Sequence, residues 1–240
     1  MIKTTLSIIL ILFALITSAQ TSVPQQRPTL DEKSVVRGED GLVYPYNVWR
    51  KLMQSGKYGV KSRQTKTDDG QQEWMIYELT AEQRKAMMDR MPKPRQSDSF
   101  IAGEKFNGFK TSDMNGNKFD LKNPTGKVIV LNFWFINCPP CKAEIPELNE
   151  LTEAYKDQDV IFLAIALDEK YLLKDFLKTL PFKYNIVDNG RFIADKYKVK
   201  GYPTHVVIDK TGTIKFSTLG LASNTIGWIK KSIDESLATN

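Results

Sequence analysis

The two cysteines of this 240-residue chain, Cys138 and Cys141, stand three positions apart in the stretch NCPPCK. A pair at this spacing can serve as a structural disulfide, as half of a metal site, or as a dithiol that is oxidised and reduced in turn. On one helical turn, residues three apart lie close enough for their sulfurs to bond. The rest of the sequence indicates which of these three chemistries is favoured.

A structural role explains the pair poorly. In the chain-entropy model, closing a four-residue loop stabilises a protein by only about 2 kcal/mol, against about 5 kcal/mol for a 100-residue loop. Structural zinc usually takes four ligands, such as two cysteine pairs or one pair with two histidines. This chain has one pair and one histidine, His205, so no resident metal or cofactor is expected. Copper held by Cys138, Cys141 and His205 stays open as an alternative, because thiolates suit cuprous copper.

A redox dithiol fits the local pattern better. An apolar strand over residues 127–135 gives way to a helix at Cys138, which places Cys138 at the N-cap, with Pro139 and Pro140 next. A helix N-terminus stabilises the thiolate, which is the reactive form of cysteine. Because Pro140 has no N–H, the Cys141 N–H is left as the main backbone donor to the Cys138 sulfur. Weaker thiolate stabilisation disfavours the reduced state, so the pair is expected to act as a reductant.

The composition is that of a globular protein, with 41% hydrophobic and 26% charged residues. The formal net charge is +6, but the lysines and arginines form no dense block and no stripe interleaved with aromatic residues. Binding to nucleic acid is therefore not expected.

The first residues have the pattern of an export signal. A lysine at position 3 precedes an apolar run over 6–16 and the small residues Thr17-Ser18-Ala19. The run is too short for a helix that needs roughly 20 residues to cross a bilayer. Residues 1–19 are therefore predicted to be a cleaved secretory signal peptide, with an uncleaved membrane anchor as the alternative. The mature chain is expected to be periplasmic or otherwise exported, without a transmembrane span, and its cysteines would meet a redox-managed compartment.

The remaining chain divides near residue 98. Residues 20–98 predict a linker, a short helix over 46–56, a hairpin around Asp68-Asp69-Gly70 and a helix that begins with a Thr80/Gln83 capping box. From 99 to 240 strands and helices alternate. The predicted elements are apolar strands over 127–135 and 159–167, helices over 138–156, 171–180 and 191–197, a hairpin over 204–220 and a last helix over 224–237. Together they predict a three-layer α/β domain.

Three parts of the chain carry a resemblance to a known family: LNFWFINCPPCKAEIP (131–146), GYPTHVVIDKTGTI (201–214) and a leading segment over 109–134. They resemble the TlpA/ResA-type exported thiol–disulfide oxidoreductases. The resemblance covers residues 105–238 and implies a thioredoxin-like domain over 99–240, with a central mixed sheet flanked by helices. Pro203 would be the cis-proline that packs against the cysteines. Tyr202 would present backbone groups to an extended substrate.

The resemblance also assigns further site residues. Glu144 matches the glutamate that these proteins carry three residues after the second cysteine, one helical turn from Cys141 and within reach of its proton. A solvated helix carboxylate is the alternative. Thioredoxin proper keeps an aspartate where Asn132 stands, and asparagine cannot titrate, which favours Glu144 as the proton acceptor. Asn137 replaces a tryptophan common in relatives, and Asn137 and Pro139 are expected at the substrate-binding rim.

The resulting hypothesis is a thiol–disulfide oxidoreductase in which Cys138 attacks a disulfide of an exported protein and Cys141 resolves the mixed disulfide. Clients would be apocytochromes with C-x-x-C-H motifs or misoxidised exported proteins, and a membrane-bound thiol donor would restore the dithiol. Three alternatives stay open: a copper chaperone, a non-catalytic interaction module, and a thiol peroxidase. The leading segment also resembles peroxiredoxins, but their P-x-x-x-T-x-x-C pattern is absent.

Overall fold

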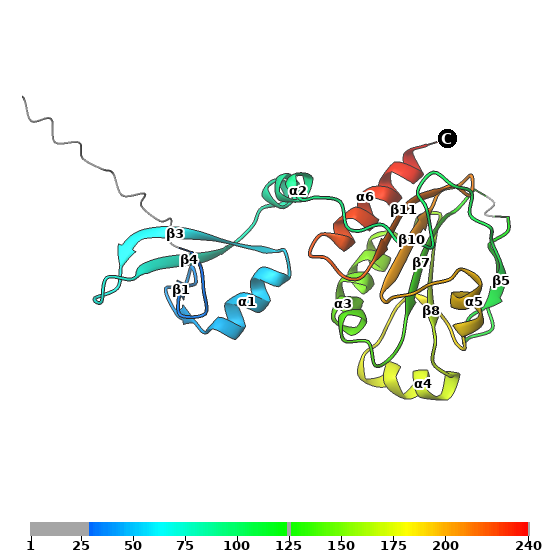
Figure 1. The fold of residues 1–240 in the computed structure, drawn as a ribbon, viewed down its shortest axis with the longest axis horizontal. Helices are drawn as coiled ribbons and strands as arrows, with labels where there is room; N and C mark the ends of the chain where they lie inside the picture. The colour runs from blue at the N-terminus through cyan, green and yellow to red at the C-terminus, as the bar shows by residue number, and fades with distance from the viewer. Residues whose placement is uncertain (1–28, 124–125, 240) are drawn as a thin grey trace, which may run out of the picture.

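The computed structural model describes residues 29–123 and 126–239 (Figure 1). The predicted signal peptide, at residues 1–19, lies outside the described residues. Within these two ranges, no helix combines the length and apolar character needed to cross a membrane. The described chain holds a four-stranded sheet in its N-terminal part, a two-stranded hairpin and a five-stranded sheet.

The N-terminal sheet has the strand order β2-β1-β4-β3 and a small core of Val36, Trp49 and Ile76. The predicted short helix is α1 (Tyr46–Gln54), and the predicted hairpin joins β3 (Tyr58–Lys66) to β4 (Gln72–Glu78). Two strands were not predicted, β1 (Val35–Arg37) and β2 (Val43–Tyr44), because three and two residues are too few to show a periodic pattern.

The helix α2 (Ala81–Arg90) begins with the predicted capping box. The Thr80 side chain accepts a hydrogen bond from the Gln83 N–H, and the Gln83 side chain accepts one from the Thr80 N–H. These two bonds satisfy backbone N–H groups that the first helical turn leaves unpaired.

The five-stranded sheet has the order β11-β10-β7-β8-β9. Figure 1 labels its first four strands. The strands β7 (Val128–Trp134), β8 (Val160–Ala166) and β9 (Asn185–Val187) are parallel. The strand β10 (Thr204–Ile208) runs antiparallel to both β7 and β11 (Ile214–Leu219). Four helices accompany this sheet: α3 (Pro139–Ala154), α4 (Lys170–Thr179), α5 (Arg191–Lys196) and α6 (Thr225–Ala238). This arrangement confirms the predicted α/β fold.

Every residue of β7 is buried, which fits a central strand covered on both faces. Alternate residues of β7 belong to two separate cores. Val128, Val130 and Trp134 pack with residues of α3, α4 and α6 on one face. Ile129, Leu131 and Phe133 face the other way, toward α5 and the segment that leads into the sheet.

Two short features of this half were not predicted. The leading segment forms a hairpin of β5 (Lys110–Ser112) and β6 (Lys118–Asp120), and β9 has only three residues at the sheet edge. Residues just before position 98 lie along β11, where the Leu219 N–H donates to the Arg95 carbonyl oxygen and the Ser97 N–H donates to Ser217 Oγ. The domain boundary near residue 98 stays a prediction.

The central strand gives a direct test of the fold. Leu131→Ala should lower the free energy of unfolding by about 2–5 kcal/mol, because it leaves a cavity around a side chain that is fully buried on the face away from α3. Guanidinium unfolding of the oxidised protein measures the change. The matched control is Leu172→Ala in α4, where the side chain is 43% exposed and the loss should stay under about 0.5 kcal/mol. Similar losses in the two variants would contradict this fold.

Candidate active site

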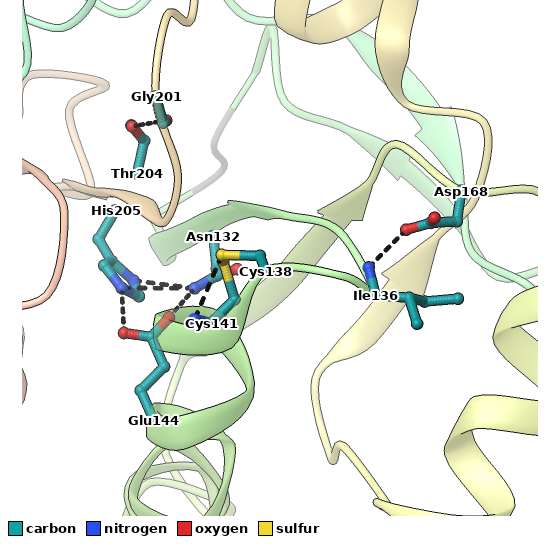
Figure 2. The surroundings of a disulfide bond; sticks show 9 residues. All are labelled: Asn132, Ile136, Cys138, Cys141, Glu144, Asp168, Gly201, Thr204 and His205. Atoms are coloured by element: carbon teal, nitrogen blue, oxygen red, sulfur yellow. Dashed lines mark hydrogen bonds and ion pairs between the residues drawn. A yellow bond between two sulfur atoms is a disulfide. The ribbon is translucent and has the colours of Figure 1, made fainter.

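The two cysteines form a disulfide at the point where β7 gives way to α3 (Figure 2). The S–S distance is 2.01 Å and the two Cα atoms are 5.3 Å apart. Cys138 is the N-cap of α3, Pro139 and Pro140 follow as its first residues, and the Cys141 N–H donates to Cys138 Sγ at 3.3 Å. This is the donor arrangement that the double-proline sequence predicts. Both cysteines are buried, with 3% and 1% of their surface exposed.

The loop between β7 and Cys138 is held by the end of the neighbouring strand. Figure 2 marks the hydrogen bond from the Ile136 N–H to Asp168. The Ile136 nitrogen is 2.8 Å from Asp168 Oδ2, and the Leu167 N–H donates to the Trp134 carbonyl oxygen at 3.1 Å. Because β7 and β8 are parallel, their carboxyl ends lie side by side. Asp168, just past β8, therefore lies where it can fix the loop that carries the cysteines. No local sequence pattern indicated this contact.

A group of three buried polar residues, here called the polar triad, lies beside the disulfide (Figure 2). It consists of Asn132 in β7, Glu144 in α3 and His205 in β10, with exposed fractions of 1%, 2% and 0%. Asn132 Nδ2 donates to Glu144 Oε1 at 2.9 Å, and His205 Nε2 lies 3.0 Å from Glu144 Oε2. Asn132 Nδ2 is also 3.2 Å from His205 Nδ1. The carboxylate is thus held by two different strands of the sheet.

The strand register explains how the triad assembles. Asn132 and His205 are directly opposite each other in the antiparallel β7–β10 pair, so their side chains share one face. That face is the one covered by α3, where Glu144 stands one turn after Cys141. Glu144 therefore lies one helical turn from the second cysteine, as the sequence predicts. The alternative of a solvated carboxylate is wrong, because the side chain is buried.

Two ionisable groups near the polar triad have raised pKa values, chiefly because they are buried. Burial raises the pKa of the Tyr184 phenol, and the charge of Glu144 raises it further. Burial likewise raises the pKa of the Glu147 carboxyl, one helical turn after Glu144. These shifts mark an interior in which added negative charge is disfavoured.

The predicted substrate-binding residues lie in different environments. The Tyr202–Pro203 peptide bond is cis, and Pro203 is buried at the start of β10. Tyr202 is half-buried, and its ring meets that of Phe135 edge-on with 5.4 Å between centroids. Asn137 and Pro139 are exposed on either side of Cys138. Two exposed residues thus flank Cys138, which is itself nearly covered.

His205 does not stand free to bind a metal, because Glu144 and Asn132 engage its ring. Among residues 29–123 and 126–239, no three His, Cys, Asp or Glu side chains are grouped so as to hold a metal ion. The copper alternative gains no support from this arrangement. Sequence reasoning placed His205 beside the site but did not foresee its contact with Glu144.

Comparison with known proteins points to one chemistry. The AhpC/TSA family matches residues 102–217. A thiol-disulfide oxidoreductase ResA of Bacillus cereus is 36% identical over 120 residues, which cover 49% of this chain and 69% of that protein. A ResA protein of Bacillus thuringiensis is 34% identical over 133 residues, covering 54% and 77%.

Solved structures agree with this fold. A Chlorobium tepidum protein provisionally named thiol:disulfide interchange protein DsbE superposes with a TM-score of 0.53 at 26% identity, covering 58% of this chain and 99% of that one. A Bacteroides thetaiotaomicron structure, provisionally named a protein disulfide isomerase, gives a TM-score of 0.54 at 23% identity, covering 60% and 94%. At 23% identity, the second match supports only the similarity of fold.

The Asp168 contact predicts a stability effect. Asp168→Ala should lower the free energy of unfolding by about 1–3 kcal/mol, because the part-buried Ile136 N–H loses its acceptor. Asp168→Asn keeps an acceptor oxygen and should lose less. The control is Glu169→Ala, whose side chain makes no capping hydrogen bond to α4. Denaturant unfolding of the oxidised proteins gives the comparison, and an Asp168→Ala value equal to the control would rule out the positioning role.

Proposed function

This chain belongs to the ResA family of thiol-disulfide oxidoreductases, and from that premise we propose that it is an exported reductase of protein disulfides. The observation that carries the proposal is the disulfide at the N-terminus of α3, with Cys138 as the N-cap and a buried carboxylate one turn beyond Cys141. Export is supported by the sequence pattern of residues 1–19.

In the proposed reaction the Cys138 thiolate attacks one sulfur of a client disulfide. A Cys138–client bond forms, and the other client sulfur leaves as a thiolate that takes up a proton from solvent. Cys141 then gives up its proton, with Glu144 as the acceptor, and attacks Cys138. The intramolecular disulfide forms and the second client sulfur leaves. Two electrons have passed to the client.

The client would approach over the exposed residues beside Cys138. Asn137 and Pro139 are exposed next to Cys138, and Tyr202 is half-buried at the loop before β10. An extended client segment along the backbone of Tyr202 and Pro203 would bring its sulfur to Cys138. Clients of the proposed kind are exported proteins with a disulfide to be opened, such as apocytochromes with C-x-x-C-H motifs. A membrane-bound thiol donor would return the electrons.

The direction of electron flow is inferred from the first turn of α3. An N-cap side chain normally accepts from the N–H groups of the second or third helical residue. Pro140 occupies the second position and offers none, so the Cys141 N–H is the local donor to Cys138 Sγ. A thiolate with one such donor is stabilised less than one with two. The reduced state is correspondingly less favoured, which suits a pair that gives electrons away.

The peroxidase alternative gains no support. Peroxiredoxins carry threonine three residues before the reactive cysteine, and here that position is Phe135, which packs on Tyr202. A phenyl ring cannot donate a hydrogen bond to a peroxide.

The client-trapping experiment tests the proposed function. Cys141→Ala removes the resolving thiol, so mixed disulfides with client proteins should accumulate at Cys138 and run as reducible adducts on non-reducing gels. The control Cys138→Ala should form none. If Cys141→Ala captures no protein in the exporting cell, and the wild-type chain does not reduce insulin, the proposed function is wrong.

The proline argument predicts a shift in reduction potential. Pro140→Ala restores an N–H at the second helical position, which stabilises the Cys138 thiolate and hence the reduced form. The potential should rise by roughly 30 mV, the equivalent of one charge-assisted hydrogen bond. Pro139→Ala is the matched control, because an N-cap side chain does not accept a hydrogen bond from the N–H of the first helical residue. Equilibration with glutathione buffers gives both values. Equal shifts in the two variants, or a fall in Pro140→Ala, would refute the argument.

A further inference from the structure

The contact between His205 and Glu144 joins two groups that can both carry a proton. Nε2 of His205 lies 3.0 Å from Oε2 of Glu144, and both side chains are closed off from solvent. An isolated carboxylate in such surroundings is strongly disfavoured unless it is protonated or paired. An imidazole at this distance can donate a hydrogen bond to the carboxylate, and one further proton taken up by the pair makes it neutral.

The oxidised structure fits one placement of the hydrogens. The Asn132 amide nitrogen donates to Glu144 Oε1 and lies 3.2 Å from His205 Nδ1 and 3.4 Å from Nε2. Because Nε2 faces a carboxylate oxygen, which accepts, Nε2 is the donor of the ring and Nδ1 is the acceptor. The ring proton then sits on Nε2 and points to Glu144 Oε2. A second ring proton, on Nδ1, would meet the amide N–H groups of Asn132. Rotation of that amide by half a turn would present its oxygen instead.

The surroundings of His205 have hydrogen-bonding capacity that the oxidised state leaves unused. Asn132 Oδ1 and Thr218 Oγ1 are buried and have no hydrogen-bond partner within the described ranges. Both residues stand directly opposite His205, one in β7 and one in β11. A buried polar group without a partner destabilises a fold. An arrangement that served stability alone would not favour two of them around one imidazole.

We propose that His205 shares with Glu144 the proton released by Cys141, so that the acceptor is the buried Glu144–His205 pair and not Glu144 alone. His205 acts through Glu144 and does not touch the client, which makes it a positioning residue. This inference rests on the proposed function of the Cys138/Cys141 couple.

Protons and electrons balance in the resolving step. The S–H bond of Cys141 breaks, and its electron pair forms the bond to Cys138 as the client sulfur leaves with the electrons of the mixed disulfide. The proton moves to Glu144 and is shared with the ring of His205, where the rotated Asn132 amide can accept from Nδ1. The pair later returns the proton to solvent, and the client thiolate takes one up from solvent.

Three other titratable groups face the Glu144–His205 pair, and their titration must be distinguished from that of the pair. Cys141 precedes Glu144 by one turn, Glu147 follows it by one turn, and Tyr184 approaches from the segment before β9. Burial raises the pKa of the Tyr184 phenol well above its ordinary range, so Tyr184 stays protonated through neutral pH. Glu147 is the group that calls for a control variant.

The single histidine of the chain allows a direct test by NMR. The Hε1 and ring ¹⁵N signals of His205 are followed against pH in the oxidised protein and in the protein reduced with dithiothreitol. The midpoint of the titration should differ between the two redox states, and Glu144→Gln should remove the difference. The same midpoint in both states of the wild-type chain would overturn the proposal.

The second measurement is the pH dependence of insulin reduction by His205→Gln. Glutamine keeps an N–H that can donate to Glu144 but cannot titrate, so a purely structural role would be preserved. The rate at pH 7 should fall on the order of tenfold, and the pH–rate profile should lose one inflection. Glu147→Gln, the control, should keep the wild-type profile. A His205→Gln profile that superposes on the wild type would overturn the proposal.

The proposed function and the role of His205 can be refuted separately. A wild-type chain that does not reduce insulin, together with a Cys141→Ala variant that captures no client, would contradict the proposed function. The NMR comparison needs only chemical reduction of the disulfide, so it would still decide whether His205 and the dithiol are linked.

Discussion

The pairing register of β7 with β10 is the constraint on which the site depends. It sets Asn132 opposite His205 and turns both side chains to the face covered by α3. A slip of one residue in β7 would turn Asn132 to the opposite core and bring Leu131 or Phe133 against Glu144. The carboxylate would then be buried among apolar groups. The apolar residues that alternate along β7 fix this register, because each side of the strand fits a different core.

The same strand determines the chemistry at its end. β7 stops at Trp134, the loop that follows is tied to Asp168, and α3 begins at Pro139 with Cys138 as its cap. The result is a disulfide that is almost covered but bordered by exposed residues. In such a site the thiolate of Cys138 depends on the nearest backbone donors. In the proposed reaction the proton of Cys141 goes to a protein group, because solvent is excluded from the polar triad. The proposed roles of Glu144 and His205 follow from that exclusion, and the proposed role of Pro140 follows from the N–H that it lacks.

Much of this was visible in the sequence, and the remainder has a physical reason for being hidden. The apolar run at 127–135 predicted β7, the proline pair predicted the N-cap position of Cys138, and helical spacing predicted Glu144 near Cys141. The contact of Glu144 with Asn132 and His205 depends on the cross-strand register of residues 73 positions apart, which no local pattern encodes. The Asp168 contact likewise spans two strands, and β9 is too short to produce a period.

The reduction potential of the Cys138/Cys141 couple tests the central claim most directly. It can be measured on the purified wild-type chain by equilibration with dithiothreitol or glutathione buffers of known ratio. A reductase of the proposed kind should have a potential nearer that of thioredoxin, about −270 mV, than that of the strong oxidant DsbA, about −120 mV. A value close to the strong oxidants would contradict the account, because the couple would then take electrons from its clients.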